Sequence, residues 1–288
     1  MKFQAVHVQL GVLLLAFLGL YYPFLLTLAE DWEKNPNYSQ GYFIPFVAAF
    51  MIWWVRDELA AAAPQPSNGG LLLIVLGLLQ LFIAKVGSEY FLQRTSMIVV
   101  LFGISLFLFG RRWTRILWLP FVYLIFMIPL PAIIWNRIAF PMQLFASALT
   151  ENLVRLLGIS ILREGNVLHL ADTSLEVVDA CSGLRSLVNI LGLAVGLGFL
   201  MNKEGWKRWA LFFAAFPIAV AVNIVRLTAT AVLASLWGGE VARGFLHDFS
   251  GWVVFVAGIA LLLLVQTVLS RAGKKAGAGA RPHATAPG

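Results

Sequence analysis

Three short polar stretches carry the side chains that could do chemistry in an otherwise apolar chain. Cys181, the single cysteine, lies in the stretch EVVDACSGLRSL. Asn223 and Arg226 lie three residues apart within an apolar run, and His247 and Asp248 begin the stretch HDFSGW. A thiol, a guanidinium and an imidazole are the groups that nucleophilic acyl transfer by a cysteine requires.

Each of the three groups has a role in such a reaction. The imidazole of His247 would take the proton from Cys181 and later return it to the leaving amine. The guanidinium of Arg226 would stabilise the oxyanion, or the thiolate, in a partly dehydrated site. His247 is the better base because two other histidines are expected across the membrane and His169 alternates with apolar residues in a ribbon.

The surroundings of Cys181 leave two readings open. We predict that the thiol lies in the first turn of a membrane helix, where unpaired backbone N–H groups favour the thiolate. Arg185 lies four residues on, hence on the same face, and with Arg226 it could also bind a substrate carboxylate. In the other reading the lone cysteine only fills space, and Arg226 snorkels or pairs with a buried acid.

The elements that must position these groups are membrane helices. Hydrophobic residues make up 60% of the 288 residues and charged residues 12%, outside the range of a soluble domain. We therefore predict an all-α polytopic membrane protein with about eight spanning helices. The expected spans are Val8–Leu28, Gly41–Val55, Leu71–Gly87, Thr95–Phe109, Ile116–Ile134, Ser182–Met201, Ala210–Ala234 and Gly251–Leu269.

The distribution of basic residues predicts the orientation. One side receives twelve of the 21 basic residues and three of the 14 acidic ones, so we expect it to be cytoplasmic and to hold both termini. The basic residues there are Lys2, Arg56, Arg111, Arg112, Arg115, Lys203, Lys207, Arg208, Arg271, Lys274, Lys275 and Arg281. These loops account for the net charge of +7, so no nucleic-acid partner is predicted.

The opposite side holds the segment that leads to Cys181. Apolar residues at helical spacing after Trp135 predict a helix in the membrane interface, and β-branched residues with turn signals after Gly158 predict a small β-ribbon. Residues 271–288 have the composition of a disordered tail. The sequence contains no phosphate loop, dinucleotide fingerprint or zinc-ligand cluster, so neither a cofactor nor a metal is predicted.

The three polar motifs together resemble those of the exosortases and archaeosortases. EVVDACSGLRSL resembles the family's cysteine signature, NIVRL its arginine motif and HDFSGW its histidine motif, in the family's order. NYSQGYFIPF, IPLPAIIWNRIAFPMQLFA and LREGNVLHL resemble further exosortase segments. The family often has YSHG where this chain has YSQG, so no catalytic role is assigned to Gln40.

The resemblance implies a membrane cysteine transpeptidase acting through a thioester on Cys181. Its substrates would be exported proteins ending in a Pro-Glu-Pro motif, a transmembrane helix and a basic tail. The acceptor would be an unknown cell-surface group, such as a lipid or polysaccharide precursor. The expected catalytic residues are Cys181, Arg226 and His247, and the expected supporting residues are Glu176, Arg185, Asn223 and Asp248.

The implied setting is the bacterial inner membrane, with the active site at the periplasmic face and membrane lipid around it. Residues 1–270 would form a single domain, with a catalytic part at about 135–252, and residues 271–288 a cytoplasmic tail. Two alternatives stay open, a noncatalytic membrane component and a transporter of extracellular polysaccharide export. A transporter should line a path across the bilayer with charge, whereas these groups are expected near one face.

Overall fold

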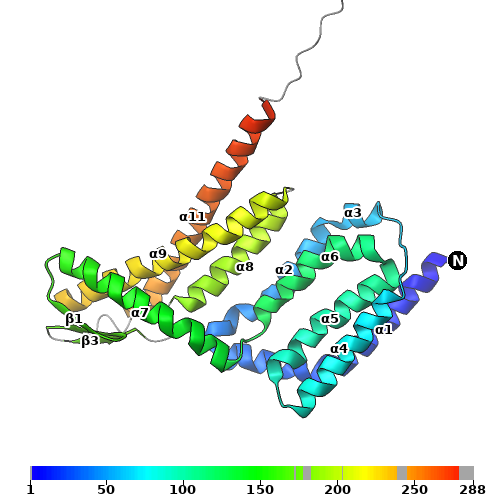
Figure 1. Ribbon diagram of the computed structural model, residues 1–288, viewed down its shortest axis with the longest axis horizontal. Helices are drawn as coiled ribbons and strands as arrows, with labels where there is room; N and C mark the ends of the chain where they lie inside the picture. The colour runs from blue at the N-terminus through cyan, green and yellow to red at the C-terminus, as the bar shows by residue number, and fades with distance from the viewer. Residues whose placement is uncertain (1, 172, 178–182, 203, 239–244, 279–288) are drawn as a thin grey trace, which may run out of the picture. The chain divides into compact units, whose positions relative to one another are not determined.

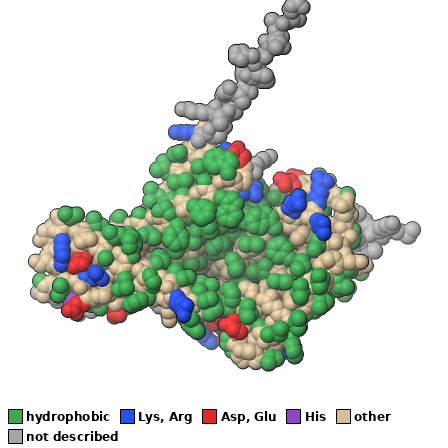
Figure 2. All heavy atoms as spheres, viewed as in Figure 1, with side chains coloured by type: hydrophobic (Ala, Val, Ile, Leu, Met, Phe, Trp, Pro, Cys, Tyr) green, Lys and Arg blue, Asp and Glu red, His purple; other side chains and the backbone are tan. Residues whose placement is uncertain are grey.

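The computed structural model describes residues 2–171, 173–177, 183–202, 204–238 and 245–278 (Figure 1). The chain divides into two compact units, Met1–Arg137 and Ile138–Gly288, and each is described by itself. In the face drawn in Figure 2, hydrophobic side chains cover most of the surface and charged side chains form small groups. This surface suits a protein that lipid surrounds.

The first unit consists of helices joined by short turns. They are α1 (Lys2–Lys34), η1 (Pro36–Tyr42), α2 (Ile44–Trp54), α3 (Arg56–Ala60), α4 (Gly69–Val86), α5 (Tyr90–Phe109), α6 (Arg111–Tyr123), η2 (Leu124–Met127) and the first residues of α7 (Ala132–Leu156). Helices η1 and η2 are of the 3₁₀ type.

Glycines allow α4 and α5 to pack closely. A Cβ on Gly70 would lie 2.2 Å from the backbone nitrogen of Phe107, and one on Gly103 would lie 2.8 Å from that of Ile74. Small residues at such a crossing let two membrane helices approach through their backbones. The backbones of α4 and α5 therefore lie in close contact.

The NYSQGY segment, which forms η1, packs against the chain that follows η2. Trp32 Nε1 donates to the carbonyl oxygen of Met127 at 2.7 Å, and the Tyr38 hydroxyl accepts from the backbone N–H of Leu130 at 3.2 Å. Gly41 lies under the Trp32 indole, where a Cβ would come within 2.2 Å of Nε1. Segments about ninety residues apart in sequence are thus held together by aromatic side chains.

The second unit contains a small sheet and three long helices. After most of α7 come β1 (Ile161–Glu164), β2 (Val167–Leu170), β3 (Ser174–Glu176), α8 (Leu184–Met201), α9 (Gly205–Trp237) and α11 (Phe245–Ala278). The strands form an antiparallel sheet in the order β1-β2-β3. The predicted ribbon is therefore confirmed, with three strands.

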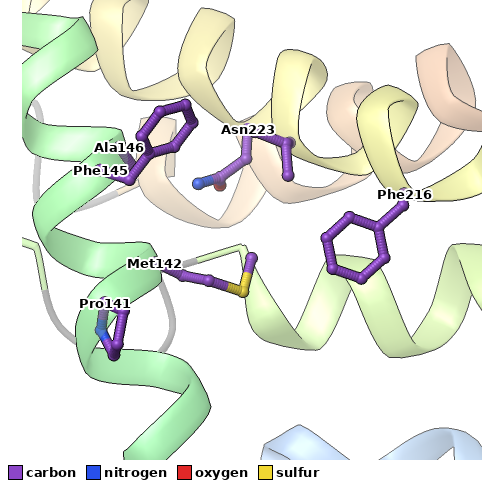
Figure 3. A pocket seen from close by; sticks show the side chains of 7 residues that line it. Pro141, Met142, Phe145, Ala146, Phe216 and Asn223 are labelled. Atoms are coloured by element: carbon purple, nitrogen blue, oxygen red, sulfur yellow. The ribbon is translucent and has the colours of Figure 1, made fainter.

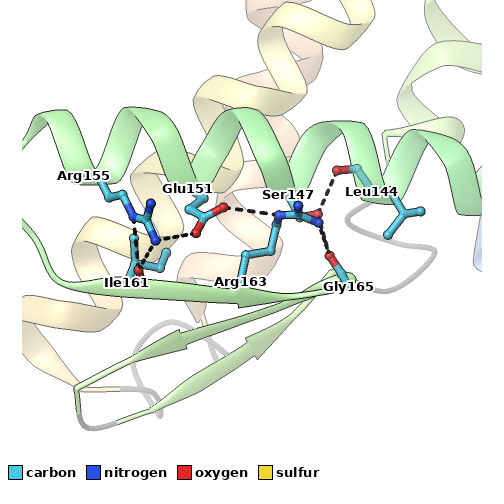
Figure 4. Close-up of polar contacts among 7 residues, drawn as sticks. All are labelled: Leu144, Ser147, Glu151, Arg155, Ile161, Arg163 and Gly165. Atoms are coloured by element: carbon cyan, nitrogen blue, oxygen red, sulfur yellow. Dashed lines mark hydrogen bonds and ion pairs between the residues drawn. The ribbon is translucent and has the colours of Figure 1, made fainter.

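Polar contacts join the sheet to α7 (Figure 4). The Glu151 carboxylate forms an ion pair with Arg155 of its own helix at 2.8 Å and another with Arg163 of β1 at 3.2 Å. Beneath them lies an apolar core that α9 completes. This core consists of Ala146, Val154, Ile161, Leu168, Leu170, Val177, Leu227, Ala231 and Ala234.

The class of fold is as predicted, an all-α membrane protein with a small sheet, but the number of spans differs. Six helices within the described residues are long and apolar enough to cross a membrane, or seven if the bent pair of α6–η2 and α7 is one span. Eight were expected. The predicted span Gly41–Val55 contains only the 11-residue α2, and the predicted span Ile116–Ile134 is interrupted after η2, in a stretch with two prolines.

Candidate active site

The nucleophile predicted from the sequence, Cys181, lies outside the described residues. The membrane helix that follows it, α8, begins at Leu184 instead of the expected Ser182, and its N-cap is Gly183. Gly183 has a φ of +81°, in the left-handed region that glycine adopts without strain. The chain therefore turns sharply into α8 two residues after the cysteine.

Gly183 packs directly against the side chain of Asn223 in α9. A Cβ on Gly183 would lie 2.8 Å from both Cγ and Nδ2 of Asn223, so no larger residue has room there. Asn223 is itself only 2% exposed. The predicted supporting residue thus contacts the segment that carries Cys181.

The residue that follows β3 is also buried near α9. Val177 belongs to the apolar core to which α9 contributes Leu227, Ala231 and Ala234. Arg226, which is 8% exposed, lies on α9 between Asn223, which contacts Gly183, and Leu227 of that core.

Helices α8 and α9 run antiparallel in constant register, as two contacts show. Gly183 contacts Asn223, and Gly198 contacts Arg208. Between these two contacts the chain advances by fifteen residues on α8 and goes back by fifteen residues on α9. Arg226 therefore stands about 4.5 Å beyond the level of Gly183, in the direction from the middle of α8 toward its N-terminus.

Helix α11 brings His247 to the same end of the bundle. Gly258 leaves room for Ile190 of α8, where a Cβ would lie 2.6 Å from Cδ1, and further along Gln266 bonds to Asn202 at 2.8 and 3.0 Å. From the first contact to the second, the residue numbers rise on both helices, so α8 and α11 are parallel. At 1.5 Å per residue, the backbone of His247 lies about 16 Å above Gly258 and Leu184 lies about 9 Å above Ile190.

The first turn of α11, which contains His247, and the start of α8 therefore lie toward the same end of the bundle, the end toward which Arg226 also lies. The sequence placed His247 and Asp248 before a helix that begins at Gly251. That boundary is wrong, because α11 begins at Phe245 and includes both residues in its first turn. The other supporting residues, Arg185 and Glu176, lie in the first turn of α8 and at the exposed end of β3.

A cavity of about 230 Å³ lies between α7 and α9, beside this end of the site (Figure 3). Six apolar residues and one amide line it, namely Pro141, Met142, Phe145, Ala146, Phe216, Val220 and Asn223. Asn223 therefore faces both the cavity and Gly183.

The sequence missed this cavity, and it missed the contact between Gly183 and Asn223. The signal for the second was present, because a glycine directly before a predicted membrane helix points to a special backbone conformation. The α7 residues gave no such signal, since Met142 and Phe145 look like any apolar face.

Gln40, where the sequence departs from the motif it resembles, lies in η1 of the first unit. Its side-chain nitrogen and oxygen are both buried and have no hydrogen-bond partner among the described residues. Such burial costs free energy, and nothing in the structure explains it.

Comparison with known families gives one match. The profile described as Transmembrane exosortase (Exosortase_EpsH) matches residues 32–264, more than three quarters of the chain. The matched range contains the cysteine, arginine and histidine motifs together with η1 and the sheet. No curated protein and no solved structure matches the chain.

Proposed function

Because the chain belongs to the transmembrane exosortase family, we propose that it is a membrane cysteine transpeptidase that cleaves C-terminal sorting signals. Its substrates are exported proteins that end in a Pro-Glu-Pro motif, a transmembrane helix and a basic tail. The new carboxyl end passes to a cell-surface acceptor, a nucleophile carried by a lipid or polysaccharide precursor.

The reaction has two acyl-transfer steps. The Cys181 thiolate attacks the carbonyl carbon of the scissile peptide bond, and the tetrahedral intermediate collapses to a thioester as the C–N bond breaks. His247 takes the thiol proton and gives it to the leaving amine. The acceptor then loses a proton to His247, attacks the thioester carbonyl and releases the thiolate.

Arg226 acts on the charge that develops in these steps. A buried guanidinium within one turn of the cysteine segment stabilises an oxyanion or a thiolate more strongly than it would in water. Asn223 holds the start of α8 in place, and Arg185 adds a second positive charge at that end. We assign Arg185, together with Arg226, to a substrate carboxylate such as that of the glutamate in the signal. Asp248 and Glu176 are assigned to support His247 and the cysteine segment.

One observation carries this proposal beyond the family. Gly183, two residues after Cys181, contacts Asn223 of α9, and Arg226 lies three residues further along the same helix. A transporter would distribute its polar residues along a path across the bilayer. The contact between the cysteine motif and the arginine helix therefore supports the proposal of catalysis over transport.

The proposed setting is a bacterial inner membrane with both termini in the cytoplasm. The site then lies at the periplasmic face, because Cys181 precedes a helix that runs toward the basic loop before α9. The substrate helix would approach from the lipid.

The test is the mass of a sorting-signal protein from cells with the wild-type chain and from cells with Cys181→Ala. We expect a shortened substrate with added mass in the wild type and full-length substrate in the variant, at equal membrane levels of both enzymes. Shortening without added mass would indicate a protease instead. Identical processing in both strains would make Cys181 a packing residue and favour the noncatalytic component.

A further inference from the structure

We propose that the cavity between α7 and α9 is a specificity pocket that receives one large apolar side chain of the sorting signal, beside the scissile bond. This proposal rests on the proposed function, because its occupant is part of the substrate. The depth, opening, size and position of the cavity each support it.

The lining of the cavity has a buried part and an exposed part, here called its floor and its rim. At the floor, Asn223 and Ala146 are 2% and 4% exposed. Phe145 of α7 and Phe216 of α9 line it as well and are each about half exposed. A side chain entering past these two rings would therefore be buried on most of its surface.

The rim opens where lipid would lie. In the register of α8 against α9, Asn223 is level with the start of the candidate span Leu184–Met201, and Phe216 and the exposed Phe213 are level with residues inside that span. An occupant must therefore come from within the bilayer. A transmembrane sorting signal does so, and a water-soluble peptide does not.

The volume of the cavity suits a single large apolar side chain. A cavity of about 150 Å³ lined by apolar residues holds one benzene molecule, so about 230 Å³ accommodates the side chain of a leucine, methionine or phenylalanine. A whole helix, about 10 Å across, is too wide. Met142 in the lining can adjust its rotamer to different occupants.

The position relates the occupant to the reaction. Asn223 lines the cavity and also contacts Gly183, and two peptide units join Gly183 to Cys181. Those two units reach at most about 7 Å, so a side chain in the pocket belongs to a residue near the bond that is cut. A lipid tail gains little there, because the bilayer is as apolar as the pocket.

Cysteine crosslinking locates the occupant. The chain has one cysteine, so Cys181→Ser with Val220→Cys leaves a single thiol in the cavity wall and keeps the substrate uncut. We expect oxidation to link it to one position of a cysteine-scanned sorting signal. The matched variant, Cys181→Ser with Val225→Cys, places the thiol on an exposed part of α9 and should give no such link. Equal links from both, or none from Val220→Cys, would overturn the proposal.

A size-exchange experiment tests specificity in the active enzyme. Val220→Phe fills the cavity, so signals with a large residue at the linked position should be processed about tenfold more slowly, while signals with alanine there recover the wild-type rate. Val225→Phe is the control and should change neither rate. Slowing of all signals alike, as a lipid site or a folding defect would cause, refutes the pocket. If processing instead proves independent of Cys181, the proposed function fails, and the crosslinking still reports on the pocket.

Discussion

At the scale of single residues, the contact between Gly183 and Asn223 connects the cysteine motif to the arginine helix. Gly183→Ala should cut signal processing at least tenfold, for two reasons. The left-handed backbone costs a residue with a Cβ about 1 kcal/mol or more, and that Cβ would clash with the Asn223 amide 2.8 Å away. Substrate processing per amount of membrane enzyme measures the effect.

A second glycine separates the two causes. Gly158 has the same φ of +81° but nothing within 4 Å of its Cβ position. Gly158→Ala should therefore lower the stability slightly and leave processing unchanged. If both variants lose processing equally, backbone strain accounts for the effect and the contact with Asn223 does not.

Arg226 provides a second prediction at this scale. Arg226→Gln removes the buried charge that we assign to the developing oxyanion, so the processing rate should fall about a hundredfold while the protein still accumulates. Arg226→Lys should retain part of the rate, because it keeps a charge but loses the forked donor geometry. The rate of signal cleavage in membranes is the measurement, with Arg137→Gln, at an exposed position of α7, as the control. Normal cleavage by Arg226→Gln would make it a structural arginine.

The sequence could predict these residue types but not their contacts. Cys181, Arg226 and His247 stand out because polar groups in an apolar chain are few and their order matches a known set of motifs. The cavity could not be predicted, since Phe145 and Phe216 lie far apart in the chain and each looks like a lipid-facing residue. Only the packing of α7 on α9 reveals that they share a wall.

At the scale of elements, the register of α8 against α11 determines where the backbone of His247 lies along the bundle axis relative to the start of α8. Two contacts define it, Gly258 with Ile190 and the double hydrogen bond between the Gln266 and Asn202 amides. The sequence predicted both helices from their apolar runs. It misjudged the start of α11, because a charged stretch such as HDFSGW resembles a loop when its helix extends beyond the apolar core.

Breaking the amide pair should therefore affect both stability and catalysis. Gln266→Leu leaves the Asn202 amide buried without this partner and should lower the free energy of unfolding by about 1 kcal/mol. Processing should fall with it, since α11 can slide against α8. Thermal unfolding in detergent and the processing rate are the two measurements.

The neighbouring hydroxyl supplies the control. Thr267 is exposed and donates only within its own helix, to Leu263, so Thr267→Val should leave both quantities unchanged. The double variant Asn202→Leu with Gln266→Leu should regain stability, because no amide is then left unpaired. A Gln266→Leu protein with normal unfolding and normal processing would show that Gly258 and Ile190 alone set the register.

At the scale of the whole molecule, contacts within the first unit show how often its chain traverses the layer of helices. Helix α5 runs from one end, where Arg94 pairs with Asp31, to the other, where Phe109 accepts from Gln65. Residues 36–60 must therefore pass from the Asp31 end to the Gln65 end. The α6–η2 segment then returns, because Met127 bonds to Trp32.

Both of these passes combine α-helix with 3₁₀-helix, which explains why neither qualifies as a span by its α-helix alone. The seven residues of η1 at about 2 Å each and the 11 of α2 at 1.5 Å give roughly 30 Å, the thickness of a hydrocarbon core. The first unit would then cross five times, and α8, α9 and α11 would add three. Eight crossings would put both termini on one side, as the basic loops predict.

Single cysteines in a Cys181→Ser chain test the composite crossing before α4. Asn35 and Ala61 are both exposed and flank the segment in question. A membrane-impermeant maleimide added from the periplasm should label Asn35→Cys and leave Ala61→Cys unlabelled until the membrane is opened, because the segment between them crosses the bilayer. Labelling of both from the periplasm would mean that residues 36–60 lie at one surface. The chain would then cross seven times, and its two termini would lie on opposite sides of the membrane.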